Sequence, residues 1–312
     1  MSNTKSAFIA IIGRPNVGKS SIVNALVAQK VAIVSDKPQT TRTRIMGVLT
    51  KGENQFVFVD TPGFHKPKNV LGQNMMKAVG NGLSDVNAAM LVVEAAPKFK
   101  FDKDNLPAAE LELINELKRR KLNAILVINK IDLLEDKEDL FEIITAYNSK
   151  FDFDTIIPVS AAKGDGIDII TNECSKYLEE SPHYFGSEDS TDQSEKTMVA
   201  EIIREKLLRS LDKEIPHGIA VDIERFFERD MANGEPILEV EATIYCEKDS
   251  HKGIIIGKGG EMLKKIGSRA RFDIEKFFGI KASVKLWVKV KEDWRNRQGL
   301  IHTFGLDWFF LL

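Results

Sequence analysis

A glycine-rich loop between an apolar run and a helical pattern constrains the fold of this chain more than any other feature. The loop spans residues 13–20, has the spacing G-x-x-x-x-G-K-S, and directly follows the apolar run 8–12. Glycines in such a loop let backbone N–H groups turn toward a phosphate at the start of a helix. A strand, this loop and a helix in that order predict a P-loop α/β fold.

Short apolar runs alternate with helical patterns as far as about residue 178. The runs are residues 8–12, 56–59, 89–93, 124–128 and 156–159, and each ends at a polar cluster. This alternation predicts βαβ units and a mostly parallel sheet that is buried on both faces. Because ligands bind outside the carboxyl ends of strands in open α/β sheets, we expect the polar clusters to form one site.

The length of 312 residues predicts two domains. We place a first domain at 6–180, a polar and acidic linker at 181–197, a smaller α+β domain at 198–295 and a tail at 296–312. A net charge of −2 excludes a uniformly basic nucleic-acid binder. Cys174 and Cys246 have no disulfide or metal spacing, and the apolar run 7–12 is too short for a signal peptide or membrane span, so a cytoplasmic protein is expected.

The loop and the next strand end predict a phosphate and magnesium site. We expect phosphate contacts from Gly13, Asn16, Val17, Gly18, Lys19, Ser20, Ser21 and Gly63. Lys19 would neutralise phosphate charge, the Ser20 hydroxyl would ligate Mg²⁺, and Asp60 would hold Mg²⁺ through water. Asp60 to Gly63 has the spacing D-x-x-G, which by itself also suits a plain turn.

Two later strand ends predict recognition of guanine. Asn129, Lys130 and Asp132 follow the run 124–128, and Ser160, Ala161 and Ala162 follow the run 156–159. A carboxylate at Asp132 can accept from the N1–H and 2-amino donors of guanine, a pair that adenine lacks. Each motif alone also fits a helix cap or an ordinary loop, but all of them in this order predict GTP and GDP as substrate and product.

The polar segment 35–44 is predicted to be a loop that switches with the nucleotide. Its candidate residues are Gln39, Thr40, Thr41, Arg42 and Thr43. A threonine here can ligate Mg²⁺ only while a γ-phosphate is present. We favour Thr41, with Thr40 as the alternative, because two adjacent threonines have the same chemistry.

The second domain carries the spacing G-x-x-G at residues 257–260, between two helical patterns. Strand patterns at 218–227, 237–246 and 281–291 surround it in the order of a type II KH module, which binds single-stranded nucleic acid. We expect RNA contacts from Gly257, Lys258, Gly259, Gly260, Lys252 and Lys264. Residues 252–297 contain 13 Lys and Arg and 5 Asp and Glu, a net charge of +8.

One face of the last strand has two interpretations. Lys285, Trp287 and Lys289 alternate with apolar residues along it. They can contact RNA directly, or they can form a solvated face with one packed tryptophan.

These motifs, together with the stretch Pro-Gln-Thr-Thr-Arg at residues 38–42, closely resemble the Era family of bacterial GTPases over residues 6–294. The resemblance implies GTP hydrolysis, binding of the 3′ region of small-subunit ribosomal RNA, and processing and maturation of the 30S subunit by a monomer. Some members of the family are peripheral on the inner membrane surface, although no sustained amphipathic anchor is present here. The apolar end, residues 308–312, is unusual for the family.

Phe64 departs from the glutamine that positions water in many small GTPases, so slow, assisted hydrolysis is expected. In related GTPases an asparagine at the place of Asn16 helps to hold K⁺, and the alternative is that Asn16 only shapes the loop. A GTPase that partners an RNA-modifying enzyme would need a further catalytic domain, which we do not find. A GTP-regulated RNA-binding scaffold that acts on other RNA or in cell-cycle control is the remaining alternative function.

Overall fold

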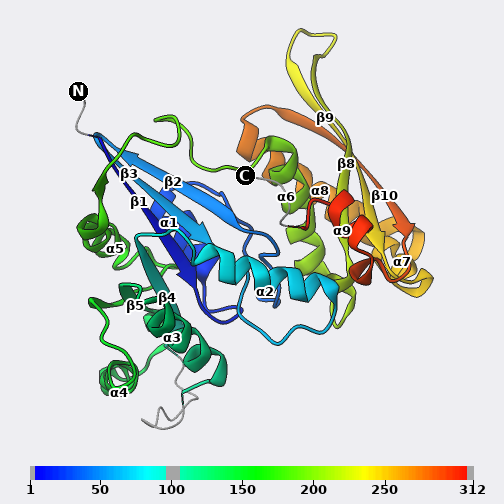
Figure 1. The fold of residues 1–312 in the computed structure, drawn as a ribbon. Coiled ribbons are helices and arrows are strands. Elements are labelled where there is room, and N and C mark those ends of the chain that lie inside the picture. The colour runs from blue at the N-terminus through cyan, green and yellow to red at the C-terminus, as the bar shows by residue number, and fades with distance from the viewer. Residues whose placement is uncertain (1–3, 96–105, 308–312) are drawn as a thin grey trace. The chain divides into compact units, whose positions relative to one another are not determined.

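The computed structural model describes residues 4–95 and 106–307, so the apolar end at 308–312 lies outside the described residues. The described chain forms two compact units (Figure 1). The first contains the chain up to residue 32, then residues 41–66 and 75–192. The second contains residues 33–40, residues 67–74 and the chain from residue 193 onward. Two short segments that flank the predicted nucleotide motifs therefore belong to the second unit.

The sheet of the first unit has the strand order β2-β3-β1-β4-β5-β6. Its parallel strands are β1 (Lys5–Ile12), β3 (Asn54–Asp60), β4 (Ala88–Glu94), β5 (Ala124–Asn129) and β6 (Thr155–Pro158). Antiparallel β2 (Ile45–Lys51) pairs with β3, and β7 (Glu179–Glu180) pairs with β1. The mostly parallel sheet confirms the predicted fold class.

Helices cover both faces of this sheet. They are α1 (Lys19–Val27), α2 (Val70–Gly82), α3 (Ala108–Arg120), α4 (Lys137–Asn148), α5 (Ile167–Cys174) and the short η1 (Ile131–Leu133) and η2 (Ser175–Tyr177). Alternate residues of β1 explain this arrangement, because Ile9 and Ile11 pack with α1 and α5, whereas Ala10 and Ile12 pack with α3 and α4. A strand that is apolar on both faces must be covered on both faces.

β2 and the two-residue β7 are strands that the sequence pattern did not reveal. β2 contains Gly47, a residue that weakens a strand signal. A Cβ at Gly47 would lie 2.6 Å from Cγ1 of Val23 on α1, so glycine is needed for α1 to approach the strand.

The predicted linker is hydrogen-bonded to the first unit for most of its length. Ser181 N donates to Thr4 O at 3.1 Å, and Val48 N donates to Ser190 O at 2.9 Å. The next helix begins at residue 195, where the Ser194 hydroxyl accepts from Thr197 N.

The second unit contains a three-stranded sheet in the order β10-β9-β8. Its elements are α6 (Glu195–Ser210), η3 (Ile215–Gly218), β8 (Ala220–Asp230), β9 (Pro236–Cys246), α7 (Asp249–Ile256), η4 (Lys258–Gly260), α8 (Glu261–Phe278), β10 (Lys281–Val290), η5 (Trp294–Asn296) and α9 (Gln298–Thr303). β10 is parallel and β8 antiparallel to β9. The order of elements is α-β-β-α-α-β, as the type II KH prediction required.

The helices α6 and α8 bury the apolar core of this second unit. Ile202 on α6 and Ile266 on α8 are fully buried with residues of all three strands. The first part of the predicted tail is also ordered, since Ile301 is buried and the Phe304 ring lies 5.4 Å from that of Trp294. None of the helices within the described ranges is long and apolar enough to cross a membrane.

Candidate nucleotide site and RNA-binding groove

The loop after β1 needs glycine at two positions. A Cβ at Gly13 would lie 2.3 Å from Val92 O, and a Cβ at Gly18, whose φ is +100°, would lie 2.1 Å from Nδ2 of Asn129. Both approaches are far shorter than a normal nonbonded contact. The G-x-x-x-x-G spacing therefore follows from close packing of this backbone against β4 and the end of β5.

Lys19 folds back over the loop from the first turn of α1. Its Nζ donates to Gly13 O at 3.2 Å and to Arg14 O at 3.0 Å. Burial lowers the pKa of Lys19 to about 8, while the nearby Asp60 carboxylate opposes this shift. Within residues 4–95 and 106–307 the ammonium donates to these two carbonyl oxygens and has one carboxylate nearby, a buried setting that suits an additional anion such as a phosphate.

Three oxygen-bearing side chains converge where Mg²⁺ was predicted. The Ser20 hydroxyl donates to Asp60 Oδ2 at 2.7 Å and lies 2.9 Å from Thr41 Oγ1, which is 3.3 Å from the same carboxylate oxygen. Burial raises the pKa of Asp60, and Lys19 opposes this effect. Asp60 Oδ1 is buried and has no hydrogen-bond partner among the described residues. An unsatisfied carboxylate oxygen beside two hydroxyls fits a hard cation with oxygen ligands.

The two adjacent threonines of the switch segment occupy different environments. Thr41 is buried in the first unit beside Ser20, whereas the Thr40 hydroxyl donates to Lys37 O at 2.6 Å within the second unit. The geometry thus brings Thr41, and not Thr40, to the oxygen cluster.

Asn129 links the phosphate loop to the predicted guanine loop. Its Nδ2 donates to Val17 O at 2.8 Å, and its Oδ1 accepts from Ala161 N at 3.0 Å. Asp132 is exposed at the same edge, and its Oδ1 accepts from the Ser160 hydroxyl at 2.5 Å. The predicted base-reading motifs therefore lie together, with one carboxylate oriented by a buried serine.

The remaining predicted residues of this unit have more varied environments. Val17 is fully buried, Ser21 lies on α1, Arg42 is buried, Thr43 is half-buried and Ala162 is exposed. Asn16 is exposed with φ +66°, Gln39 has φ +61° in the second unit, and Lys130 pairs with Glu94 at 2.9 Å.

Gly63 and Phe64 close the phosphate loop from the side of β3. A Cβ at Gly63 would lie 2.7 Å from Pro15, and Phe64 N donates to Gly13 O at 3.0 Å. The Phe64 side chain packs against the apolar cluster under α3 and α4. It contributes no polar group in place of the glutamine of other small GTPases.

The sequence did not predict a buried carboxyl behind the loop, which is hydrogen-bonded by two side chains. Arg14 Nε donates to Glu110 Oε1 at 2.5 Å, and the Tyr147 hydroxyl donates to the other carboxylate oxygen. Glu110 is fully buried, and burial raises its pKa. Only its place in the first turn of α3 could have drawn attention to it, because acidic residues are common there.

A groove of about 620 Å³ lies between α8 and the sheet of the second unit. Leu263, Val284 and Leu286 give it an apolar floor, and Lys264 and Arg271 give it a basic edge. Gly260, the last glycine of G-x-x-G, also lines it. A basic and apolar groove beside a glycine loop suits a single nucleic-acid strand, because bases and phosphates find complementary surfaces.

The glycine loop itself is tightly turned. Gly257 has φ +75°, and a Cβ there would lie 2.8 Å from Met262 Cβ, whereas Gly259 and Gly260 have positive φ and open surroundings. Lys258 is exposed on this loop, and Lys252 lies on α7, outside the groove lining. Arg271 and Ser268 line the groove and were not predicted.

The outward face of β10 resembles a solvated face, which is the alternative to direct RNA contact. Lys285 pairs with Glu241 at 3.4 Å and Lys289 with Glu224 at 3.2 Å, and Trp287 is 42% exposed. Lys285 is thus paired with a carboxylate of the neighbouring β9, and Lys289 with a carboxylate of β8.

Comparisons with known proteins agree with this architecture. Residues 8–130 match the family model described as 50S ribosome-binding GTPase, and residues 214–295 match the KH domain model. The GTPase Era of Clostridioides difficile (strain 630) is 49% identical over 303 residues, which cover 97% of this chain and 99% of the relative. The chain belongs to the Era family of GTPases. The GTPase Era of Ruminiclostridium cellulolyticum is 47% identical over 302 residues, covering 96% and 97% of the two chains.

Two solved Era structures match almost the whole chain at 34% identity. One is a variant of Aquifex aeolicus Era bound to GDP·AlF4⁻, with a TM-score of 0.89, and the other is Era in complex with MgGDPNP and nucleotides 1506–1542 of 16S ribosomal RNA, with a TM-score of 0.90. Each covers 98% of this chain and 100% of the Era chain. The predicted family, the fold and the assignment as a GTPase are thereby confirmed.

Proposed function

We propose that this Era-family GTPase binds the 3′ region of small-subunit ribosomal RNA through its KH groove and promotes processing of that RNA and maturation of the 30S subunit. The observation that carries the proposal is the basic and apolar groove beside the G-x-x-G loop. The Era complex with nucleotides 1506–1542 of 16S ribosomal RNA supports the choice of RNA, since it matches over nearly the full chain. We place the protein in the cytoplasm, where assembling ribosomal subunits are found, and regard peripheral membrane contact and a monomeric state as parts of this proposal.

At the nucleotide site, Lys19 and the backbone N–H groups of Gly13 and of residues 16–21 hold the phosphates, and Gly63 meets the γ-phosphate. The hydroxyls of Ser20 and Thr41 would ligate Mg²⁺ and Asp60 would hold it through water, and the bound ion would supply positive charge to the phosphates. Asp132 reads guanine, while Asn129 fixes the distance between the phosphate loop and the Ser160–Ala161 turn. Because Phe64 has no polar group, hydrolysis by this chain needs added positive charge or positioning from elsewhere.

Asn16 is our proposed ligand for K⁺ as that added charge. It is exposed at the outer turn of the phosphate loop with a left-handed backbone. GTP turnover measured in K⁺ and in Na⁺ buffer tests this role, with Asn16→Ala as the matched variant. We expect the protein to hydrolyse GTP faster in K⁺ than in Na⁺, and Asn16→Ala to lose this difference. Equal rates of the unmodified protein in both salts would show that K⁺ has no role in hydrolysis.

Crosslinking of bound RNA in cells, followed by sequencing, tests the proposed target. We expect crosslinks concentrated at the 3′ end of small-subunit ribosomal RNA, and reduced when Lys264 and Arg271 are both replaced by alanine. Crosslinks spread over unrelated RNA, or unchanged in the double variant, would contradict the assignment.

A further inference from the structure

The segment 33–40 connects the nucleotide site to a helix that carries no nucleotide motif. It ends immediately before Thr41, whose hydroxyl lies beside Ser20. The segment belongs to the same compact unit as α6 and the KH sheet. The conformation of residues 33–40 therefore determines the position of Thr41, which follows them in the chain.

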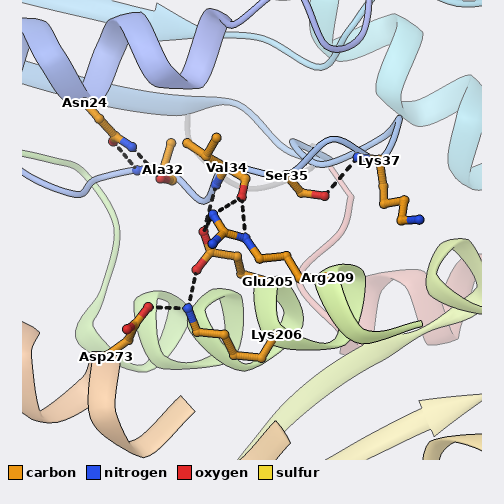
Figure 2. A network of polar contacts seen from close by, with 9 residues as sticks. All are labelled: Asn24, Ala32, Val34, Ser35, Lys37, Glu205, Lys206, Arg209 and Asp273. Atoms are coloured by element: carbon orange, nitrogen blue, oxygen red, sulfur yellow. Dashed lines mark hydrogen bonds and ion pairs between the residues drawn. The ribbon is translucent and has the colours of Figure 1, made fainter. Parts of the chain in front are cut away.

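Two side chains of α6, one helical turn apart, bind both backbone polar groups of Val34 (Figure 2). Glu205 Oε1 accepts from Val34 N at 3.2 Å, while Arg209 donates to Val34 O from Nη2 at 2.8 Å and from Nε at 3.2 Å. This pairing occupies the N–H and C=O of Val34 as a neighbouring strand would. It fixes the first end of the segment.

Arg204, on the same helix, fixes the other end. Its Nη2 donates to Thr40 O, and the peptide group that contains this oxygen joins Thr40 to Thr41. Arg204 is 2% exposed and also donates from Nε to Glu201 Oε1 at 2.7 Å. A planar guanidinium held by a carboxylate has little freedom to move away from the carbonyl.

The charges that hold the segment are mutually paired, and Arg204 and Glu205 are buried whereas Arg209 is half exposed. Glu205 is 1% exposed and bonds Lys206 at 2.9 Å and Arg209 at 3.1 Å, and Lys206 also contacts Asp273 of α8 (Figure 2). Buried ion pairs add little net stability, but they penalise arrangements that leave one partner unpaired. The network therefore adds little to the free energy of unfolding, and its main effect is to favour one conformation of residues 34–40. Because α8 also lines the groove, the network connects the groove helix with the segment before Thr41.

We propose that Arg204, Glu205 and Arg209 are positioning residues for GTP, because they hold residues 34–40 in the conformation that delivers Thr41 to Ser20 and Asp60. This inference rests on the proposed role of Thr41 as a ligand that acts only in the GTP state. A nucleotide without a γ-phosphate gains nothing from the placement of Thr41, so the three α6 residues discriminate between GTP and GDP.

Fluorescent GDPNP and GDP, bound in the presence of Mg²⁺, provide the test with the full chain. Arg209→Ala is the main variant, since the Arg209 side chain is 50% exposed and its removal leaves the core intact. Arg204→Ala and Glu205→Ala, each of which removes its contact with the segment, are the second and third variants. We expect about tenfold weaker GDPNP binding with less than about twofold change for GDP, and a lower kcat for GTP. Arg204→Lys should recover part of the loss, because it restores a donor for Thr40 O.

Two further variants distinguish a failure of the proposed Thr41 role from a failure of the α6 positioning role. Arg229→Ala removes an arginine that pairs with Glu239 at 2.6 Å in the same unit, and it should change neither affinity. Thr41→Ala should weaken GDPNP selectively, and if it does not, the proposed role of Thr41 fails. If Thr41→Ala is selective while the α6 variants leave GDPNP unchanged, or weaken GDPNP and GDP equally, the positioning role is overturned.

Discussion

The nucleotide site and the RNA groove of this chain are built on opposite physical principles. In the nucleotide site Lys19, Thr41 and Asp60 are buried, and their partners lie within hydrogen-bond distance before any ligand is considered. In the groove Lys264 and Arg271 are exposed along an apolar floor. A preorganised polar site loses much of its affinity when one group is removed, whereas an open charged groove loses affinity in small, salt-dependent steps.

The largest effect is expected at Asp132, the proposed base-reading carboxylate. Asp132→Asn should weaken GTP binding at least about 100-fold, because the variant presents a donor to the guanine donors. It should also improve binding of xanthosine triphosphate, whose 2-oxo group accepts that donor. Titration with both nucleotides gives the answer, and loss of both affinities together would indicate misfolding and not altered base recognition.

A smaller effect is expected when the groove loses charge. Lys264→Ala and Arg271→Ala should each weaken binding of a 3′-end ribosomal RNA oligonucleotide about tenfold or less, and each should reduce the slope of log K against log salt by about 1. Nucleotide binding should remain unchanged. Lys285→Ala, on the outward face of β10, is the matched control and should leave RNA affinity nearly unaltered. If Lys285→Ala weakened RNA binding as much as the groove variants do, the RNA site would have to include the outward face of β10.

A still smaller effect concerns Glu110 behind the phosphate loop. Burial raises the pKa of Glu110 above its usual value of 4.5. At pH values between 4.5 and the folded-state pKa, the folded protein therefore holds a proton on Glu110 that the unfolded chain has released. The contribution of Glu110 to stability should therefore fall as the pH rises from about 4.5 through the folded-state pKa. Thermal unfolding of the protein and of Glu110→Gln across pH 4.5–8 isolates this component. A stability difference that does not change with pH would show that Glu110 does not titrate in this range.

The same contrast explains how much could be predicted from the sequence. Strands β1, β3, β4, β5 and β6 and the convergence of their polar ends were predicted, because apolar runs and strand-end chemistry are local patterns. The choice between Thr40 and Thr41 depends on how the segment before them is held, which no local pattern encodes. Glu110 on α3 and Tyr147 on α4 were missed because buried polar residues on helices resemble solvent-facing ones in sequence, and Arg14 was missed because a charged residue in a loop usually faces solvent. Their pairing exists only after the chain has folded.

In the groove, the glycine loop was predicted from its spacing and the positive charge from simple counting. Lys252 was placed there on charge alone, yet it lies on α7 outside the groove lining, whereas Arg271 and Ser268 line the groove. Helical periodicity does not state which face of α8 remains open once the core is packed. The sequence could therefore place the groove at a helix and a glycine loop, but it could not give the side chains that line it.

Because the α6 network connects the segment before Thr41 with the groove helix α8, the nucleotide state should control RNA binding, and affinity for RNA in the two nucleotide states tests this coupling most directly. The binding of an oligonucleotide with the sequence of the small-subunit ribosomal RNA 3′ end should be measured with Mg²⁺ and either GDPNP or GDP, at fixed salt. If GTP controls the RNA-binding domain, the two dissociation constants differ by about tenfold, and Thr41→Ala abolishes the difference. Equal affinity for the RNA in both nucleotide states would contradict the account.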